Sequence, residues 1–225
     1  MNIAQIMQTI SVAIIPLLFA ITVHEVAHGY IASKLGDKTA LMLGRLTLNP
    51  VKHIDPVGTI LVPLITLILG GVLFGWAKPV PITWQNLKNP RRDMAIVALA
   101  GPAANLLMAL IWALFIKLIM LLHLNAISVN NNIMEFLYLT SSIGVWINCI
   151  LMILNLIPIP PLDGSRVVSS LLPRHASYYY DKIEPYGLFI LLGLLAIGVL
   201  SYLILPLAVG IFHMIEAIFQ IRLAF

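Results

Sequence analysis

Two histidines and a glutamate lie within one apolar stretch near the start of the chain, where ionisable side chains are costly. The stretch runs IIPLLFAITVHEVAH, and the three residues are His24, Glu25 and His28. Side chains four residues apart lie on the same face of a helix, so both imidazole rings can reach one metal ion. The H-E-x-x-H pattern is typical of hydrolytic zinc sites, in which the glutamate takes a proton from the attacking water. The sequence therefore predicts a zinc site with Glu25 as general base.

A hydrolytic zinc site uses three protein ligands, so a third residue is needed. Asp163 is the strongest candidate because it ends an apolar run in which Pro158, Pro160 and Pro161 exclude helix. A carboxylate in such a place is costly unless it is paired or bound to metal. The alternative is that Asp163 caps a helix that begins near Ser165, a position where aspartate is common.

Other residues compete for the role of third ligand. His213 is the remaining histidine inside an apolar block, whereas His53, His123 and His175 lie in polar connections. A zinc protease of another class would use a downstream glutamate, and the candidates are Glu135, Glu184 and Glu216. None of these has a setting as suggestive as the proline-rich turn before Asp163.

The composition indicates an integral membrane protein. The chain has 225 residues, of which 60% are hydrophobic and 10% are charged, and its mean hydropathy is +1.00. Soluble domains have about 25% charged residues. We expect a single membrane domain over residues 1–225, with the lipid bilayer as its surroundings and no nucleic-acid partner. The formal net charge of +4 is better explained by topology than by nucleic-acid binding. The lone Cys149 excludes a disulfide framework.

Apolar segments follow one another along most of the chain. They cover residues 6–31, 57–74, 94–122, 133–156 and 186–219, the last being long enough for two segments broken near Pro206. A spanning helix needs about 20 apolar residues. We therefore predict an all-α polytopic membrane protein, a bundle of about five to six transmembrane or re-entrant segments. No basic residue precedes the first segment, so it is expected to be retained rather than cleaved.

The distribution of Lys and Arg predicts the topology. Basic residues lie on both sides of segment 57–74, which conflicts with the positive-inside tendency if that segment spans. We favour a re-entrant segment and an N-terminus outside, with an ordinary spanning helix as the alternative. The connection 123–132 would then be outside, and the basic residues expected inside are Arg166, Arg174, Lys182 and Arg222.

A small β element is expected near the active site. Residues 41–50 contain partly alternating leucines, and Pro79 and Pro81 exclude helix over 77–82. Paired strands at membrane depth would offer an edge to which an unwound peptide could add. The alternative is a pair of plain interfacial loops.

The two main motifs together resemble the site-2 protease family of intramembrane zinc metalloproteases. They are HEVAHGY at 24–30 and NLIPIPPLDG at 155–164, joined by AGPAAN at 100–105 and FGWAKPVP at 74–81. The resemblance implies one Zn²⁺ per chain, bound by His24, His28 and Asp163. It also implies that Glu25 is the general base and acid, and that Asn155 contacts the substrate or the oxyanion.

The same resemblance implies a substrate class and a location. The family cleaves membrane-spanning segments of other proteins near the cytoplasmic face, so the expected partners are membrane proteins with a transmembrane segment. The chain lacks room for PDZ or CBS domains and is similar to compact bacterial members. The expected location is therefore a prokaryotic cytoplasmic membrane, with the active site towards the cytoplasm.

Alternatives from other classes share some of these residues. A membrane metal-binding or transport protein without peptidase activity would use the buried ligands but has no need of Glu25. A catalytically silent relative would not need this glutamate either. Gly101 and Asn105 are expected mainly to form a helix-packing face with an interhelical hydrogen bond. Lys78 and Arg166 are interpreted as topology anchors rather than ligands.

Overall fold

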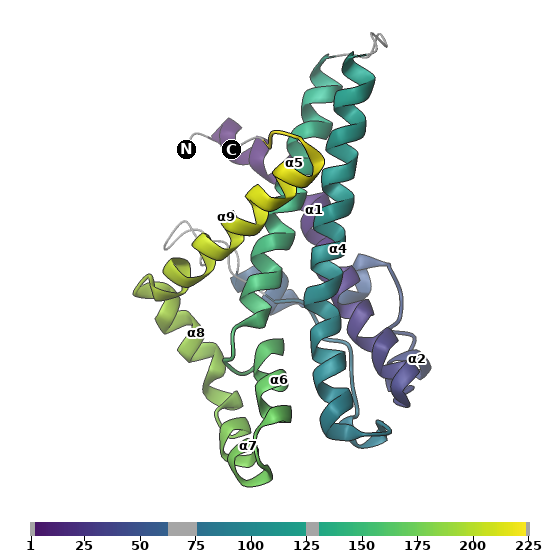
Figure 1. Cartoon of the computed structure of the whole chain (residues 1–225), viewed down its shortest axis with the longest axis vertical. Coiled ribbons are helices and arrows are strands. Elements are labelled where there is room, and N and C mark those ends of the chain that lie inside the picture. The colour runs from purple at the N-terminus through teal and green to yellow at the C-terminus, as the bar shows by residue number, and fades with distance from the viewer. Residues whose placement is uncertain (1–2, 63–75, 125–130, 224–225) are drawn as a thin grey trace.

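The computed structural model describes residues 3–62, 76–124 and 131–223, and most of these residues are helical (Figure 1). Four of the described helices contain a stretch long and apolar enough to cross a membrane. They are α1 (Ile3–Leu35), α4 (Pro90–Leu124), α5 (Asn131–Leu156) and α9 (Val199–Phe219). The predicted helical membrane bundle is confirmed, with four candidate spans among the described residues.

Shorter helices and turns gather at one end of the bundle, beside the start of α4 (Figure 1). The end of α4 and the beginning of α5 lie at the opposite end (Figure 1). The α-helices of this group are α2 (Thr39–Met42), α6 (Asp163–Leu171), α7 (Arg174–Asp181) and α8 (Gly187–Ala196). The short turns are η1 (Pro50–His53), η2 (Pro56–Leu61), η3 (Trp84–Asn86) and η4 (Glu184–Tyr186).

The apolar core of the bundle lies between α4, α5 and α9. Ala109 and Ala113 on α4 are fully buried, which lets neighbouring helices approach closely. On the other side of α5, the rings of Trp146 and Phe212 meet edge to face, with centroids 5.5 Å apart. This packing holds the long helices in place around the polar residues described below.

The described residues contain no β-strand, so the predicted β element is wrong for this part of the chain. Residues 39–42 are helical instead, and residues 76–83 form no β-strand. Pro79 and Pro81 have no N–H groups to donate to a β-ladder. The N–H of Val80, between them, donates to the carboxylate of Glu25. The extended segment is therefore held by Glu25 of α1 and by isolated backbone hydrogen bonds to His53 and Gly58 rather than by a β-ladder.

The predicted re-entrant segment falls largely on residues 63–75, which lie outside the described residues. Its described flanks meet, because Trp76 N–H donates to the carbonyl of Gly58 over 3.0 Å. The hydroxyl of Thr59 also donates to the Trp76 carbonyl over 2.9 Å. A single crossing would separate these flanks by about 30 Å. Their contact agrees with the prediction that both basic loops lie on one side.

The last apolar block breaks at Gly198, and the prediction of a break near Pro206 is wrong. Gly198 has φ +77°, a conformation that glycine adopts without steric cost, and it separates α8 from α9. Pro206 lies inside α9, as prolines are tolerated in membrane helices. α8 has 10 residues and is too short to cross alone.

The C-terminal residues lie beside the first turns of α5. The hydroxyl of Tyr138 donates to the carbonyl of Arg222 over 2.7 Å. α5 begins at the end of the bundle that is remote from α6 (Figure 1). The prediction that Arg222 lies on the same side as Arg166 is therefore wrong. The described residues of this block contain one candidate span, α9, where the sequence suggested two segments.

Candidate active site

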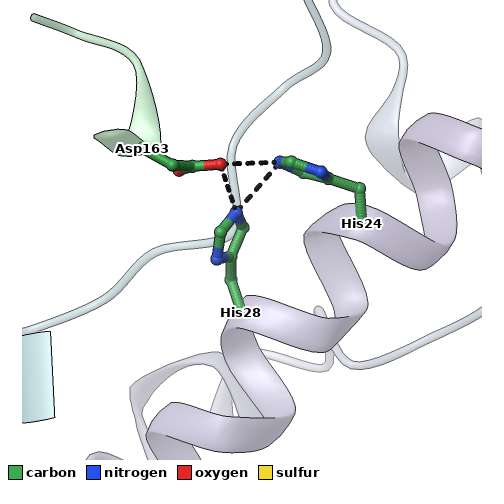
Figure 2. A group of neighbouring side chains, drawn as sticks. All are labelled: His24, His28 and Asp163. Atoms are coloured by element: carbon green, nitrogen blue, oxygen red, sulfur yellow. Dashed lines mark hydrogen bonds and ion pairs between the residues drawn. The ribbon is translucent and has the colours of Figure 1, made fainter. Parts of the chain in front are cut away.

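His24, His28 and Asp163 converge, although α1 and α6 are far apart in the sequence. The Nε2 atoms of the two histidines are 3.0 Å apart. Asp163 Oδ2 lies 3.2 Å from Nε2 of His24 and 3.3 Å from Nε2 of His28. Figure 2 shows the three side chains pointing towards one another. Among the described residues, these three form the one cluster of His, Cys, Asp or Glu that could hold a metal ion.

The cluster fits a zinc ion in spacing and in chemistry. Zinc–ligand bonds of about 2.0–2.1 Å place tetrahedral ligand atoms about 3.3 Å apart. The three observed separations are close to this value. Oδ2 of Asp163 is buried and has no hydrogen-bond partner. A buried carboxylate oxygen without a donor is costly, and a metal ion would satisfy it.

The other nitrogen of each imidazole is fixed by a hydrogen bond. Nδ1 of His28 lies 2.7 Å from the carbonyl of Val97 on α4, which can only accept, so Nδ1 carries the proton. Nδ1 of His24 lies 2.6 Å from Oδ1 of Asn105. Each Nε2 lone pair is then directed at the cluster, an arrangement that orients histidines in metal sites.

The orientation of Asn105 follows from its other contacts. Its Nδ2 donates to the carbonyl of Ala20 over 3.3 Å and to Oδ1 of Asn148 over 3.0 Å. Both acceptors require N–H groups, so Oδ1 must face His24. Nδ2 of Asn148 donates in turn to the carbonyl of Gly144. A chain of buried amides therefore runs from α5 through α4 to the first histidine. The packing role expected for Asn105 is combined with direct support of His24.

Gly101 leaves room for the two histidines. A Cβ atom at this position would lie 2.4 Å from Nε2 of His28 and 2.6 Å from Nε2 of His24. No side chain can therefore occupy the position without displacing the cluster. Residues 101 and 105 are four apart on α4, so both face the pair of histidines four apart on α1. This shared spacing of four residues is the feature of the sequence that could have placed Gly101 and Asn105 next to the histidines.

Glu25 lies next to the extended segment 76–83 and, like the three clustered residues, lines one cavity. Its Oε2 accepts a hydrogen bond of 2.7 Å from Val80 N–H. A side chain on Gly29, one turn later, would collide with Val80, so this segment lies directly against α1. Glu25 is thereby held beside the cluster by backbone of a separate loop.

A buried aspartate anchors the far end of that segment. Asp37 follows α1 and accepts hydrogen bonds from Thr83 N–H over 2.7 Å and from Asn86 Nδ2 over 3.1 Å. It also accepts from the N–H and the hydroxyl of Thr39. Burial opposes ionisation, but these hydrogen bonds outweigh it and hold the pKa of Asp37 below its usual value. The loop that contacts Glu25 is thus tied to α1 by Glu25 and to the turn after α1 by Asp37.

A cavity of about 540 Å³ connects the cluster to the remaining candidates. Asn155 lines it, and its Nδ2 donates to the carbonyl of Leu151 on the same helix over 2.9 Å. That contact uses one of its two N–H groups and leaves the second for the cavity. Arg166 and Glu184 line the cavity as well and form an ion pair. The sequence had assigned Arg166 to the membrane surface alone.

The rival ligands lie elsewhere or are otherwise engaged. His213 is exposed on α9 and pairs with Glu216 over 2.7 Å. Glu184 pairs with Arg166, and Glu135 is exposed. Asp163 is the first residue of α6, whose N-cap is Leu162, and no side chain caps this helix. The carboxylate faces the histidines instead.

These features define a class of protein: a helical membrane protein with a buried His-His-Asp cluster beside a glutamate. The model of "Peptidase family M50" matches residues 12–134 and 117–198. The chain belongs to this family, the site-2 protease family.

Named relatives agree with this assignment. The chain is 38% identical over 211 residues to "Putative zinc metalloprotease YwhC" of Bacillus subtilis, with 92% of each chain covered. It is 33% identical over 148 residues to "Putative zinc metalloprotease Rip2" of Mycolicibacterium smegmatis, covering 65% of this chain and 52% of that protein. No solved structure matches the chain. The protein is thus a membrane zinc metalloprotease, while the roles of the individual site residues stay predictions.

Proposed function

We propose that this protein is an intramembrane endopeptidase that hydrolyses peptide bonds in or near transmembrane segments of other membrane proteins. One observation carries the proposal: the His-His-Asp cluster and Glu25 share a cavity, and the histidines belong to a candidate span, Ile10–Leu35. His28 lies seven residues before the end of that span, which corresponds to about 10 Å along the helix. A site at this depth is reached by a peptide that enters the bundle.

The three clustered residues, His24, His28 and Asp163, would hold one Zn²⁺ per chain. When bound, zinc polarises a carbonyl group and lowers the pKa of its water to about 7. The buried amides of Asn105 and Asn148 keep the imidazole of His24 oriented for this purpose.

Glu25 is proposed as general base and general acid. Its Oε2 is held by Val80 N–H, so proton transfer is assigned to Oε1. Glu25 takes a proton from the attacking water and delivers it to the leaving amine. Asn155 would use its second N–H to bind the oxyanion or the substrate carbonyl.

The expected substrates are membrane proteins with a transmembrane segment, cleaved for signalling or for removal of membrane remnants. A helix hides its scissile bonds, so the substrate must unwind where it enters the cavity. The cavity is lined in part by residues of α6, which lies at the same end of the bundle as α2 (Figure 1). In the sequence, Lys34 and Lys38 come just before α2 and Arg45 comes just after it. By the positive-inside tendency this end is proposed to face the cytoplasm of a prokaryotic cell.

The test compares the membrane proteomes of cells that express the wild type, Glu25→Gln or Glu135→Gln. Glu135 is exposed on α5 and serves as the matched control. We expect particular single-span proteins or truncated stubs to accumulate in Glu25→Gln cells, with their released fragments only in the other two. Identical proteomes, with all three proteins expressed and zinc-loaded, would contradict the proposal. A metal transporter would keep its flux in Glu25→Gln.

A further inference from the structure

Three separate segments of the chain bring charged and aromatic side chains together at the cavity. Arg166 comes from α6, Glu184 from the turn before α8, and Trp84 from the loop before α4. All three line the cavity that contains Glu25 and Asp163. Nη2 of Arg166 donates to Oε1 of Glu184, and the guanidinium lies over the Trp84 ring, 5.8 Å from its centroid. The group therefore forms part of the wall that a bound peptide would contact.

The two charges of this group differ in how firmly they are held. The Arg166 side chain is 23% exposed, and Trp84 covers one face of its guanidinium. The Glu184 side chain is 38% exposed, and no other polar contact holds its carboxylate among the described residues. A guanidinium has five N–H donors, and the hydrogen bond to Glu184 uses one of its nitrogens. Arg166 is thus the more firmly held partner, and its remaining N–H groups can bind another acceptor.

We propose that Arg166 is a specificity-determining residue that binds a carboxylate of the peptide substrate, the side chain of an Asp or Glu near the scissile bond. Glu184 is the counter-ion of the guanidinium in the free enzyme and yields to the substrate. This inference rests on the proposed peptidase function. It assigns to Arg166 a role in substrate choice in addition to any effect on topology.

An anionic substrate group fits this site better than a cationic one. A substrate carboxylate can form a forked pair with the guanidinium, the strongest geometry available to arginine. Glu184 can then turn outwards into water, because it is the more exposed partner. A substrate Lys or Arg at Glu184 would instead lie next to the guanidinium, which is held in place by Trp84. Repulsion between the two cations would oppose such binding.

The position of Arg166 limits which substrate residue can reach it. Arg166 is three residues after Asp163, so the two side chains leave the same face of α6, with Cβ atoms about 5–6 Å apart. An extended peptide advances about 3.4 Å per residue. The carboxylate that binds Arg166 therefore belongs to a residue within about three positions of the scissile bond.

The experiment uses the full-length, zinc-loaded protein in liposomes with a single-span substrate whose cleavage site has been mapped. Glu, Gln or Lys is placed in turn at each of three positions on either side of that site. The readout is the ratio of kcat/KM for the Glu and Gln substrates, which does not depend on the fraction of active enzyme. For the wild type we expect a preference of about fivefold to tenfold for Glu at one position, as a partly exposed charged pair allows.

Variants of the pair separate recognition from structure. Arg166→Gln should reduce the ratio to about one, and Glu184→Gln should keep or increase it because the competing carboxylate is gone. Arg166→Lys keeps the positive charge but cannot form two parallel hydrogen bonds with a carboxylate, so it should give an intermediate ratio. If Arg166→Gln is inactive, the ratio of Arg166→Lys tests the proposal in its place. Arg91→Gln is the matched control, because Arg91 also ties α6 in place, through the Leu172 carbonyl, without lining the cavity. It should keep the wild-type ratio.

Three results would overturn the inference while leaving the peptidase function intact. They are a ratio near one at every position in the wild type, an unchanged ratio in both Arg166 variants, and a preference for Lys that disappears in Glu184→Gln. Absence of any Glu25-dependent cleavage by the wild type would instead overturn the proposed function itself. The two failures are therefore distinguishable in one set of assays.

Discussion

The contact between α1 and α4 and the contact between α5 and α9 are both buried, but they are held together in different ways. In the first, Asn105 of α4 joins the imidazole of His24 on α1 and is itself bonded to Asn148 of α5. In the second, apolar side chains such as Ile204, Ala208 and Phe212 pack against α5. A buried polar chain admits few arrangements and so fixes individual atoms. Apolar packing fixes the position of a helix without fixing any one atom.

This difference predicts two kinds of variant. Changes at the α1–α4 contact should alter metal binding and activity with little loss of stability, because interhelical hydrogen bonds within membranes are worth about 0.6 kcal/mol on average. Changes at the α5–α9 contact should lower stability and leave the metal site intact. Zinc content and thermal unfolding, measured together on each variant, test this separation.

The largest effect is expected from Asp163→Ala. This change removes the carboxylate that lies 3.2 Å from Nε2 of His24 and 3.3 Å from Nε2 of His28. With two ligands left, we expect zinc content to fall from one ion per chain to below about one tenth, and activity to be lost. Elemental analysis of purified protein checks this. Stoichiometric zinc in a folded Asp163→Ala protein would refute the ligand assignment.

Gly101→Ala should be nearly as damaging, although it adds only one carbon atom. The new Cβ would lie 2.4 Å from Nε2 of His28, closer than any van der Waals contact allows. We expect zinc loss in a protein that still unfolds cooperatively. Gly210→Ala is the matched control, because a Cβ at that position in α9 meets nothing within 4 Å. If both variants retain zinc equally, the close approach of α4 to the histidines is not required.

Asn105→Leu should weaken zinc binding without abolishing it. The change removes the acceptor for Nδ1 of His24 but leaves all three proposed ligands. Loss of such a supporting contact lowers metal affinity about 10- to 100-fold. Competition with a chelator measures the affinity. Thr140 lies on α5, and its buried hydroxyl has no hydrogen-bond partner, so Thr140→Val should leave the affinity unchanged. Equal affinities in all three proteins would contradict the proposed support of His24.

The residues that the sequence predicted and those that it missed differ in the same physical way. The sequence indicated four site residues, His24, Glu25, His28 and Asp163. Ionisable groups in an apolar segment are costly, so their presence there indicates a functional role. The partnership of Arg166 with Glu184 was not recognisable, because it depends on how α6 folds back towards α8. A basic residue in a loop has an ordinary explanation in topology.

The two errors about backbone structure have local causes. Alternating leucines over 41–50 indicated a strand, but Pro79 and Pro81 removed the donors that a partner strand would need. Pro206 indicated a helix break, but membrane helices tolerate proline, and the break occurred at Gly198 in the left-handed conformation. In both regions the sequence pattern did not determine which backbone hydrogen bonds would form.

Phe212→Ala tests the apolar side of the comparison. Phe212 is buried on α9 and meets the Trp146 ring edge to face. Removing the ring should lower the free energy of unfolding by about 3 kcal/mol, whereas zinc content stays at the wild-type value. Thermal unfolding in detergent measures the change. Leu207→Ala, on the exposed face of the same helix, should have a much smaller effect. Loss of zinc in Phe212→Ala would contradict the prediction that the α5–α9 contact affects stability alone.

The smallest effect concerns Asp37, which joins the α1 end of the polar region to the loop that contacts Glu25. Because its pKa is lowered in the folded state, its ionised form stabilises the fold above the unfolded pKa of about 3.9. That contribution is lost as the pH falls through the lower, folded-state pKa. Asp37→Asn should therefore be less stable than wild type at pH 6, and the difference should shrink below about pH 4. Thermal unfolding of both proteins with zinc removed measures this, and a difference independent of pH would show that the charge of Asp37 does not stabilise the loop.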